Sequence, residues 1–303
     1  ISNDWLQEQI DSINNKVPMI DNDLFVNRID YIIQTAHTRK NQKGGYGLSE
    51  GRIKNYRLFK NVIENYQKEK HKKQLYIREV TPKFFTKFKD WLFSKEYSIN
   101  YIGKIISNLK VIINDAQKND IPTSIQIKQM EGMTQKKERE QIIYLTFDEL
   151  EKIEEAELTN MYLINARNWL LLGCYLGQRG SDLLNVKPEH IKVINNIKLI
   201  ELQQQKTGKN IAIPLLPKAL QILENTPPYK ISMQKFNDYI KEVCKISGTD
   251  ELKEGVIFDD KTKKKIKGMY PKYDLVSTHV CRRSFATNFY GDIPTSILKD
   301  ITG

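Results

Sequence analysis

The chain has 303 residues, 40% of them hydrophobic and 28% charged, a balance typical of folded globular proteins that excludes wholesale disorder. An excess of 48 Lys and Arg over 37 Asp and Glu gives a formal charge of +11, which favours an anionic partner, nucleic acid before an acidic membrane surface. No run of about 18 uninterrupted apolar residues occurs, so no membrane span is expected, and the most apolar segment, 161–176, is predicted to be a buried helix.

The first 120 residues are predicted to form a small bundle of four helices with short connections. Apolar side chains at helical spacing place these helices at residues 21–34, 49–66, 81–92 and 98–116. The third has a clear start, with Thr81 as the N-cap and Pro82 at the first helical position. Its aromatic side chains share one face and are interpreted as core rather than as a surface for stacking bases.

Basic side chains on the polar faces of this bundle are predicted to contact the phosphates of a nucleic acid. They are Lys54, Arg57, Lys60, Lys104 and Lys110. An ordinary solvated surface charge is the alternative for each of them. Residues 121–140 are polar and charged without a helical period, and we interpret them as a linker to a second domain.

The second half is predicted to be a mixed α/β unit whose first helix has a capping box at residues 146–149. The buried helix 161–176 follows, Gly177 ends it, and Ser181 is predicted to cap the next helix. Arg179 is therefore expected in a tight turn between two helices.

Short strands and helices alternate in the rest of the chain. Strands are predicted at about residues 190–194, 197–204 and 210–213, and helices at 217–224 and 232–246. Lys206 falls at the tip of the hairpin between the second and third strands. A further strand is expected at 256–258, followed by a solvated basic turn at 261–267. Two final helices are predicted, the first around His279 and the second at 294–301.

His279 and Arg282 are the most informative pair of residues. At a spacing of three residues on a helix, with Ser277 marking its start, they share one face and can grip one anion. Such pairs also occur on helices without a chemical role. Arg179 and Lys206 add two more cations, although the first alternatively caps the preceding helix and the second is alternatively an ordinary charged hairpin tip.

The cysteines and histidines indicate neither a disulfide nor a metal site. Cys174, Cys244 and Cys281 are far apart, odd in number and inside predicted helices, which suits a reducing cytoplasm. The four histidines form no ligand pattern, so chemistry without a metal or cofactor is expected. The chain opens at Ile1 without a signal-peptide pattern, and we interpret this start as a truncation.

The order Arg179, Lys206, His279-x-x-Arg282 resembles the tyrosine recombinase (phage integrase) family. The run Leu-Gly-Gln-Arg-Gly-Ser-Asp-Leu-Leu looks like the family's first arginine box, with Asp182 at its acidic position, where it is also an alternative ion-pair partner for the arginine. The later run Ser-Phe-Ala-Thr continues the second box, and Tyr-Leu-Thr-Phe-Asp-Glu-Leu resembles the opening of the catalytic unit. The N-terminal bundle resembles the SAM-like core-binding domain of integrases of Bacteroides-type elements.

The resemblance implies a role for each cation. Arg179 and Arg282 would clamp the scissile phosphate, Lys206 would protonate the leaving 5′ oxygen, and His279 would be the acid/base partner. Arg283, where the family often has histidine, is expected to contact a phosphate or solvent. The implied reaction is site-specific DNA recombination, the integration or excision of a mobile element, through a 3′-phosphotyrosyl intermediate and without a cofactor.

The resemblance also implies a mainly α fold with a small β-sheet. Residues 1–120, with a lead-in over 1–21, would be a helical SAM-like core DNA-binding domain, 121–140 the linker, and 141–303 a mixed α/β catalytic domain of the tyrosine recombinase type. The implied partner is double-stranded DNA at attachment or recombination sites, bound as a tetramer, with a monomer as the free form. The implied location is the bacterial cytoplasm, at the nucleoid and away from membranes.

The family's nucleophilic tyrosine is expected just after Gly303, so the catalytic domain is expected to be C-terminally incomplete and inactive alone. Tyr273 and Tyr290 lie outside the expected motif, and Tyr290 is predicted to pack inside the His279 helix. Two alternatives remain open. One is a non-catalytic DNA-binding relative that occupies recombination sites, and the other is a type IB topoisomerase-like enzyme that cuts without synapsis.

Overall fold

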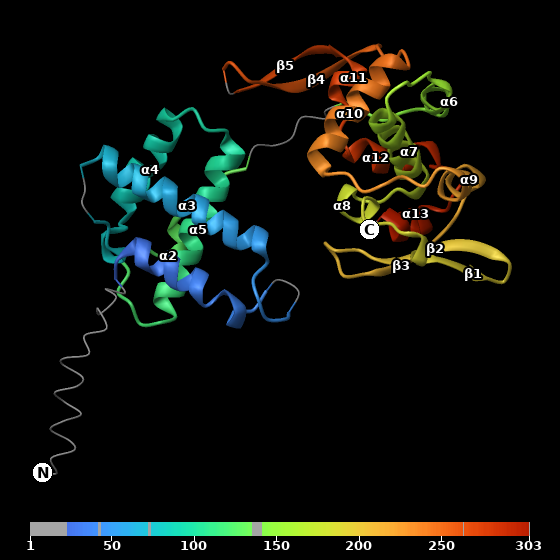
Figure 1. Cartoon of the computed structure of the whole chain (residues 1–303). Helices are drawn as coiled ribbons and strands as arrows, with labels where there is room; N and C mark the ends of the chain where they lie inside the picture. Colours follow the sequence, from blue (N-terminus) through green and yellow to red (C-terminus); the bar gives the residue numbers. More distant parts are fainter. Residues whose placement is uncertain (1–22, 42–43, 72–73, 135–140, 263, 303) are drawn as a thin grey trace, which may run out of the picture. The chain divides into compact units, whose positions relative to one another are not determined.

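Two compact units make up the computed structural model (Figure 1), which describes residues 23–41, 44–71, 74–134, 141–262 and 264–302. The N-terminal unit comprises Ile1–Lys137 and the C-terminal unit Glu138–Gly303. The division between them falls within residues 121–140, where the sequence predicts a linker.

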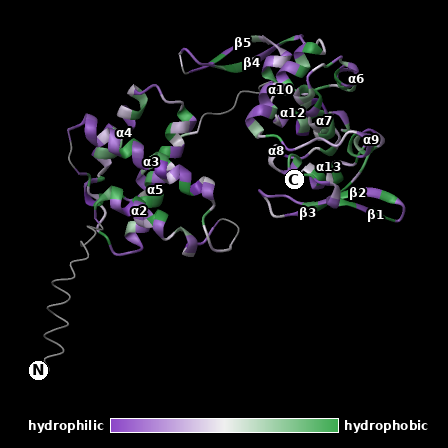
Figure 2. Ribbon diagram, in the orientation of Figure 1, coloured by the Kyte–Doolittle hydropathy of each residue, from purple (hydrophilic) through white to green (hydrophobic). Residues whose placement is uncertain are grey.

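The N-terminal unit is built from the four predicted helices. They are α2 (Phe25–Gln34), α3 (Glu50–Glu69), α4 (Pro82–Ser94) and α5 (Ile99–Gln117), with the 3-10 turns η1 (Ala36–Thr38) and η2 (Ile77–Glu79) between them. Ser49, Thr81 and Ser98 cap the last three helices, each with its side-chain oxygen accepting a backbone N–H of the first turn. Hydrophilic and hydrophobic residues alternate around these helices (Figure 2), as expected for helices that bury one face.

The core of this unit centres on α5 and extends beyond it. Ile102 and Ile106 on α5 are fully buried. Ile125 and Met130 are buried in the same core, on either side of the 3-10 turn η3 (Ile127–Gln129). These residues therefore pack with the N-terminal unit, although the sequence places them in the predicted linker, because the apolar side chains of this polar segment, with Ile121 and Met133 beside them, contact the core.

The central helix of the C-terminal unit is α7 (Met161–Leu176) (Figure 1). Helices packed against it include α6 (Phe147–Glu155), α8 (Gly180–Leu183), α9 (Pro217–Asn225), α10 (Met233–Ile246) and α12 (His279–Asn288). The short α11 (Lys272–Leu275) precedes α12, and α13 (Thr295–Thr302) packs against α12. The predicted capping box is present on α6, where the Thr146 N–H donates to Glu149 Oε2 at 2.7 Å.

A three-stranded antiparallel sheet follows α8 and the 3-10 turn η4 (Pro188–His190). Its strands are β1 (Ile191–Ile194), β2 (Ile197–Gln203) and β3 (Asn210–Pro214), each within one residue of its predicted range. Ile200 pairs with Ile213 in the β2–β3 register, and both side chains are buried. The sheet thus packs one face onto the core and leaves its hairpin ends in solvent.

A second sheet is the hairpin of β4 (Leu252–Asp259) and β5 (Lys264–Pro271), and here the prediction was wrong in part. The sequence predicts a strand only at 256–258 and a basic turn at 261–267, whereas β5 begins inside that turn. Most β5 side chains are exposed, because a two-stranded hairpin buries little of either face. A strand with little buried surface does not need alternating apolar and polar residues, so the pattern by which strands are predicted is missing here.

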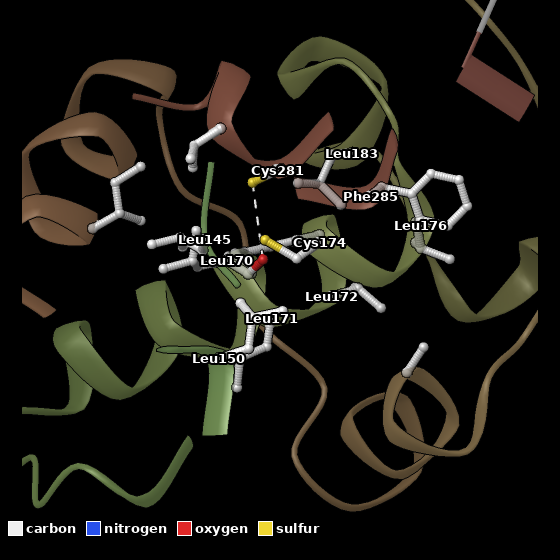
Figure 3. Close-up of a cluster of buried hydrophobic side chains, with 14 of the residues drawn as sticks. Leu145, Leu150, Leu170, Leu171, Leu172, Cys174, Leu176, Leu183, Cys281 and Phe285 are labelled. Carbon is white, nitrogen blue, oxygen red and sulfur yellow. Dashed lines mark hydrogen bonds between the residues drawn. The ribbon is translucent and has the colours of Figure 1, made fainter. Parts of the chain in front are cut away.

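The core of the C-terminal unit surrounds α7 (Figure 3). Leu170 and Leu172 of α7 and Cys281 and Phe285 of α12 are buried there, and Cys281 Sγ lies 3.8 Å from the Leu170 carbonyl oxygen. Burial also raises the pKa of the Cys244 thiol, so this cysteine is a packed core residue rather than a nucleophile. One face of α12 is thereby fixed to the centre of the unit.

Gly177→Ala is expected to destabilise the C-terminal unit. Gly177 ends α7 with a φ of 67°, a left-handed conformation that costs alanine about 1–2 kcal/mol. An added Cβ would lie 2.5 Å from Phe285 Cδ1, and such overpacking costs about 1–3 kcal/mol more. Denaturant titration should show the free energy of unfolding reduced by about 2–5 kcal/mol.

Gly248→Ala is the matched control for this packing. Gly248 follows α10 with a φ of 75°, and an added Cβ would meet nothing within 4 Å, so only the backbone cost applies. Equal losses in the two variants would contradict the contact between Gly177 and Phe285.

Candidate active site

Arg179 lies in the turn between α7 and α8, as predicted. It is the N-cap residue of α8, and its carbonyl oxygen accepts the N–H groups of Asp182 and Leu183 at 2.9 and 2.8 Å. Its guanidinium Nη1 donates to Gln204 Oε1 at 3.2 Å. The turn thus fixes the backbone of Arg179, and a side chain from the β2–β3 hairpin bonds to its guanidinium.

The start of α12 packs directly against this turn. Gly180 begins α8, so Ser181, predicted as the N-cap, is the second residue of the helix and that prediction was wrong. A Cβ on Gly180 would overlap the side chains of Thr278 and Met233. Glycine after Arg179 therefore permits the close approach of α12.

Lys206 lies exposed in the turn between β2 and β3, as predicted. The Gln204 N–H donates to the Lys209 carbonyl oxygen at 2.9 Å, and the Gly208 N–H donates to the Gln204 carbonyl oxygen at 2.7 Å. Gly208 has a φ of 71°, which favours glycine. Thr207 Oγ1 donates to Gln204 Oε1 at 2.8 Å, so both backbone and side chain of Gln204 organise this turn.

His279 is the first residue of α12, and Arg282 follows one turn later on the same helix. The helix does not start with Ser277 as its cap, contrary to the prediction: Thr278 is the N-cap residue, without a side-chain cap bond. Instead Asn237 Oδ1 accepts both the N–H and the Oγ1–H of Thr278, each at 2.7 Å. The neighbouring helix α10 thus supplies the polar group that a local cap would have given.

The opposite side of α12 is held by the segment before α6. Ser284 Oγ accepts the Leu145 N–H at 2.8 Å, and Asn288 Nδ2 donates to the Leu145 carbonyl oxygen at 2.9 Å. Ser284 is fully buried. The helix is therefore clamped on its core side while His279 keeps contact with solvent.

Four positive charges act on His279. Partial burial lowers the pKa of His279 below its ordinary value, and neighbouring cations lower it further. These cations are Arg283, Arg282, Arg179 and Lys206. Burial also lowers the pKa of Arg282, Arg179 adds to the effect, and Asp182 opposes it. The structure thus brings the four predicted site residues, from two turns and one helix, into one electrostatic cluster.

Asp182 is the acidic member of this cluster. It is 5% exposed, and its Oδ1 accepts the Gln205 N–H at 3.0 Å, which joins α8 to the turn that carries Lys206. Its Oδ2 is buried and makes no hydrogen bond to the residues that the structure describes. The charge of Asp182 acts on Arg282, against the four cations that act on His279, so the cluster keeps excess positive charge for an anion.

The pKa of His279 gives a direct test of the cluster. We expect NMR titration of the DNA-free protein to show a midpoint below the ordinary value of about 6.5. Arg283→Ala should raise this midpoint more than Lys206→Ala does, because Arg283 exerts the larger effect. The unfolded chain binds this proton more readily, so the histidine's contribution to stability is lost as pH falls from about 6.5 through the lowered pKa. A midpoint at or above 6.5 would contradict the convergence of charges.

The remaining DNA-binding candidates differ in exposure. Lys54 and Arg57 on α3, Lys104 on α5 and Arg283 on α12 are exposed, whereas Lys60 and Lys110 are half-buried. Lys60 Nζ binds Asp30 Oδ2 at 2.7 Å and lies 3.9 Å from Glu64 Oε1, so a phosphate would compete with this pair. Lys104 and Arg52 line a groove of about 700 Å³ beside α3 and α5. A role in DNA binding stays a prediction for all six.

Tyr290 is not packed inside a helix, contrary to the prediction. The helix α12 ends at Asn288, and Tyr290 is 72% exposed in the turn that follows, where its backbone bridges to Ile293. Gly291, with a φ of 102°, reverses the chain at this point. Tyr273 lies half-buried on α11.

Among the residues that the structure describes, no group of three or more His, Cys, Asp and Glu side chains is arranged to hold a metal ion. Over the same residues, none of the helices combines the length and apolarity needed to cross a bilayer.

The uncharged residues that bond to the site were not predicted from the sequence. Gln178 and Gln204 are fully buried, and Asn237 binds the start of α12. Their closeness in sequence to the predicted cations could have pointed to the two glutamines: Gln178 directly precedes Arg179, and Gln204 stands two residues before Lys206. Amides, however, are common on surfaces, and only the fold shows that these two are buried.

Two protein-family models match this chain and define its class. Residues 27–130 match the model of the phage integrase SAM-like domain, and residues 143–303 match that of the phage integrase family. The second match alone spans more than half of the chain. The chain therefore belongs to the phage integrase family and is a tyrosine-type site-specific recombinase.

Solved structures of recombinases share this fold. A lambda integrase tetramer bound to a Holliday junction has a TM-score of 0.62 at 18% identity, covering 98% of this chain and 84% of that one. The XerH site-specific recombinase in a post-cleavage complex gives 0.60 at 14%, covering 95% and 90%. The Tn1549 transposon integrase with transposon right end DNA gives 0.58 at 12%, covering 92% and 90%. No curated protein matches the sequence. The predicted fold class is thus confirmed.

Proposed function

We propose that Arg179, Lys206, His279 and Arg282 form the active site at which this recombinase breaks and rejoins DNA through a 3′-phosphotyrosyl intermediate. The observation that carries this proposal is that the turn holding Arg179 packs against the start of α12, which carries His279 and Arg282, and bonds through Gln204 to the turn that carries Lys206. Gathering cations around one histidine is unfavourable unless an anion binds among them. A phosphodiester is such an anion.

Each residue has a distinct proposed part in the chemistry. A tyrosine hydroxyl attacks the scissile phosphorus, the bond to the 5′ oxygen breaks, and a 3′-phosphotyrosine forms. Arg179 and Arg282 hold non-bridging oxygens with their planar guanidinium groups. Lys206 gives a proton to the leaving 5′ oxygen, while His279, kept neutral near pH 7 by its lowered pKa, accepts the proton of the tyrosine. Rejoining is the reverse, with a 5′ hydroxyl as the attacking group.

The division of labour between the units follows the family matches. We assign core DNA binding to the N-terminal unit, supported by the SAM-like match over residues 27–130, and catalysis to the C-terminal unit. Lys54, Arg57 and Lys104 are the exposed cations proposed to contact phosphates from the first unit, and Arg283 from the second. Such contacts position a protein on DNA without reading its sequence.

The proposed partner is double-stranded DNA at a recombination site, and the proposed active assembly is a tetramer. The similar structures of lambda integrase include a tetramer bound to a Holliday junction and a dimer bound to a core site. A monomer is proposed for the free chain, and the bacterial cytoplasm, at the nucleoid, for its location.

A covalent adduct tests the proposed function. The protein expressed from its complete gene is incubated with DNA from the ends of its own element, and the denatured reaction is examined for a protein linked to a 3′ phosphate. Peptide mapping then identifies the tyrosine, with Tyr290→Phe as a variant expected to retain the adduct. Sequence-specific binding without an adduct would favour a non-catalytic relative, and relaxation of supercoils without strand exchange would favour a topoisomerase.

A further inference from the structure

Gln204 lies at the junction of three elements and is completely buried. It follows the last residue of β2 and opens the turn that carries Lys206. A buried carboxamide costs free energy unless its polar atoms are bonded, and every polar atom of this side chain has partners. The identity of those partners indicates what the residue does.

The side-chain oxygen of Gln204 faces the proposed active site. Oε1 accepts from Arg179 Nη1 at 3.2 Å and from Thr207 Oγ1 at 2.8 Å. Thr207 directly follows Lys206 in the turn. One oxygen atom therefore joins the guanidinium of the first arginine to the turn that carries the lysine.

The side-chain nitrogen of Gln204 faces the opposite way, toward α13. Nε2 donates to Gln178 Oε1 at 3.1 Å and to the Ile301 carbonyl oxygen at 3.2 Å. Gln178 Nε2 donates to the same Ile301 oxygen and to the Leu176 carbonyl oxygen, both at 3.0 Å. Ile301 lies in the last turn of α13, whose carbonyl groups lack partners within the helix. Two buried amides thus bind the end of α13.

A salt bridge at the surface joins the same two elements. Lys209 Nζ, on the other arm of the turn, binds Asp300 Oδ1 at 2.7 Å. Both side chains are largely exposed, so this pair contributes little to stability. The buried amides are the stronger link between the turn and α13, because their loss leaves polar groups unpaired in the core.

We propose that Gln204 is a positioning residue for DNA cleavage: its carboxamide holds Arg179, the Lys206 turn and the end of α13 as one hydrogen-bonded unit. The proposal rests on the proposed function of Arg179 and Lys206. Gln204 is fully buried and has no surface with which to contact DNA, so it acts through the residues to which it is bonded. Its role is to keep two cations from separate elements aligned on one phosphate and to transmit any displacement of α13 to both.

Hydrogen exchange of the DNA-free protein tests, without relying on catalysis, whether Gln204 links the 204–209 turn to α13. Gln204→Met, which removes all four bonds, should speed amide exchange in both the 204–209 turn and α13. Gln204→Glu keeps oxygens for Arg179 and Thr207 but has no amide to donate to Ile301, so it should speed exchange in α13 and leave the turn protected. Gln205→Met is the matched control, because the Gln205 side chain is exposed and only its backbone N–H binds Asp182.

Cleavage assays of the same variants in the complete protein test the catalytic part. Gln204→Met should slow cleavage by about 10–100-fold at unchanged DNA affinity, because a displacement of about 1 Å is enough for such a loss. With a 5′-bridging phosphorothiolate the deficit should shrink, since a sulfur leaving group does not need the proton of a misplaced Lys206. Gln205→Met should cleave like the wild type.

Two results would overturn the positioning role. The first is exchange in α13 and in the turn that stays as slow in both Gln204 variants as in Gln205→Met. The second is cleavage by Gln204→Met at the control rate, or an equal deficit on the oxygen and sulfur substrates accompanied by an equal loss of affinity. A wild-type protein that forms no adduct would contradict the proposed function instead. The hydrogen-exchange result would still show whether Gln204 couples the 204–209 turn to α13.

Discussion

Arg282→Ala is expected to remove most DNA cleavage while leaving DNA binding nearly intact. Arg282 is half-buried on α12, close to Arg179 and Asp182 in the cluster proposed to hold the scissile phosphate. Loss of one preorganised donor to a transition-state oxyanion slows catalysis on the order of 10²–10³-fold. Affinity should change little, because it is shared among many phosphate contacts. Strand breakage at saturating protein gives the rate, and fluorescence anisotropy gives the affinity.

Arg283→Ala separates a site residue from a neighbour of equal charge. Arg283 is the next residue of α12 and is exposed. Its loss should lower the DNA affinity and make that affinity less dependent on salt, with a smaller effect on the cleavage rate at saturating protein. If Arg282→Ala instead lost binding and cleavage to the same extent, the arginine would be structural and the proposed phosphate clamp would be wrong.

Lys272→Ala is expected to cause a large loss of stability. Lys272 is 4% exposed, and its Nζ lies 2.6 Å from both carboxylate oxygens of Glu149 in the capping box of α6. Removing one partner of a buried pair leaves the other charge uncompensated, which costs about 3–5 kcal/mol. The free energy of unfolding from denaturant titration should fall by this amount.

The double variant Lys272→Met with Glu149→Gln distinguishes the charge from the packing. Glutamine still offers an oxygen to the Thr146 N–H, and no buried charge remains, so most of the lost stability should return. Lys218→Ala breaks the exposed pair with Glu154 and should cost only about 0–1 kcal/mol. If Lys272→Ala were as stable as Lys218→Ala, the ion pair between Lys272 and Glu149 would not hold α11 to α6.

Local signals in the sequence predicted most elements of the fold, and tertiary contacts explain the exceptions. The N-cap Thr81 and the capping box at residues 146–149 could be predicted because their hydrogen bonds lie within one helical turn. The expected cap at Ser277 failed because Asn237 on another helix binds the start of α12. The strand β5 escaped detection because its exposed lysines need no alternation to pair with β4.

The candidate site shows the same division. Arg179, Lys206, His279 and Arg282 were predictable because charge, spacing and the resemblance of their surroundings to a known family all marked them. Gln204 was not, because nothing local shows that an amide in a polar run will be buried beneath a turn and bonded to three elements.

The leaving-group dependence of Lys206→Ala tests whether Arg179, Lys206, His279 and Arg282 have separate roles in one phosphoryl transfer. The cleavage rate of the complete protein is measured on matched DNA with an oxygen or a sulfur at the 5′-bridging position of the scissile phosphate. Lys206→Ala should be slow on the oxygen substrate and near the wild-type rate on the sulfur substrate, whereas Arg282→Ala should be slow on both. Equal slowing of Lys206→Ala on the two substrates would contradict its role as proton donor and with it the proposed division of the site.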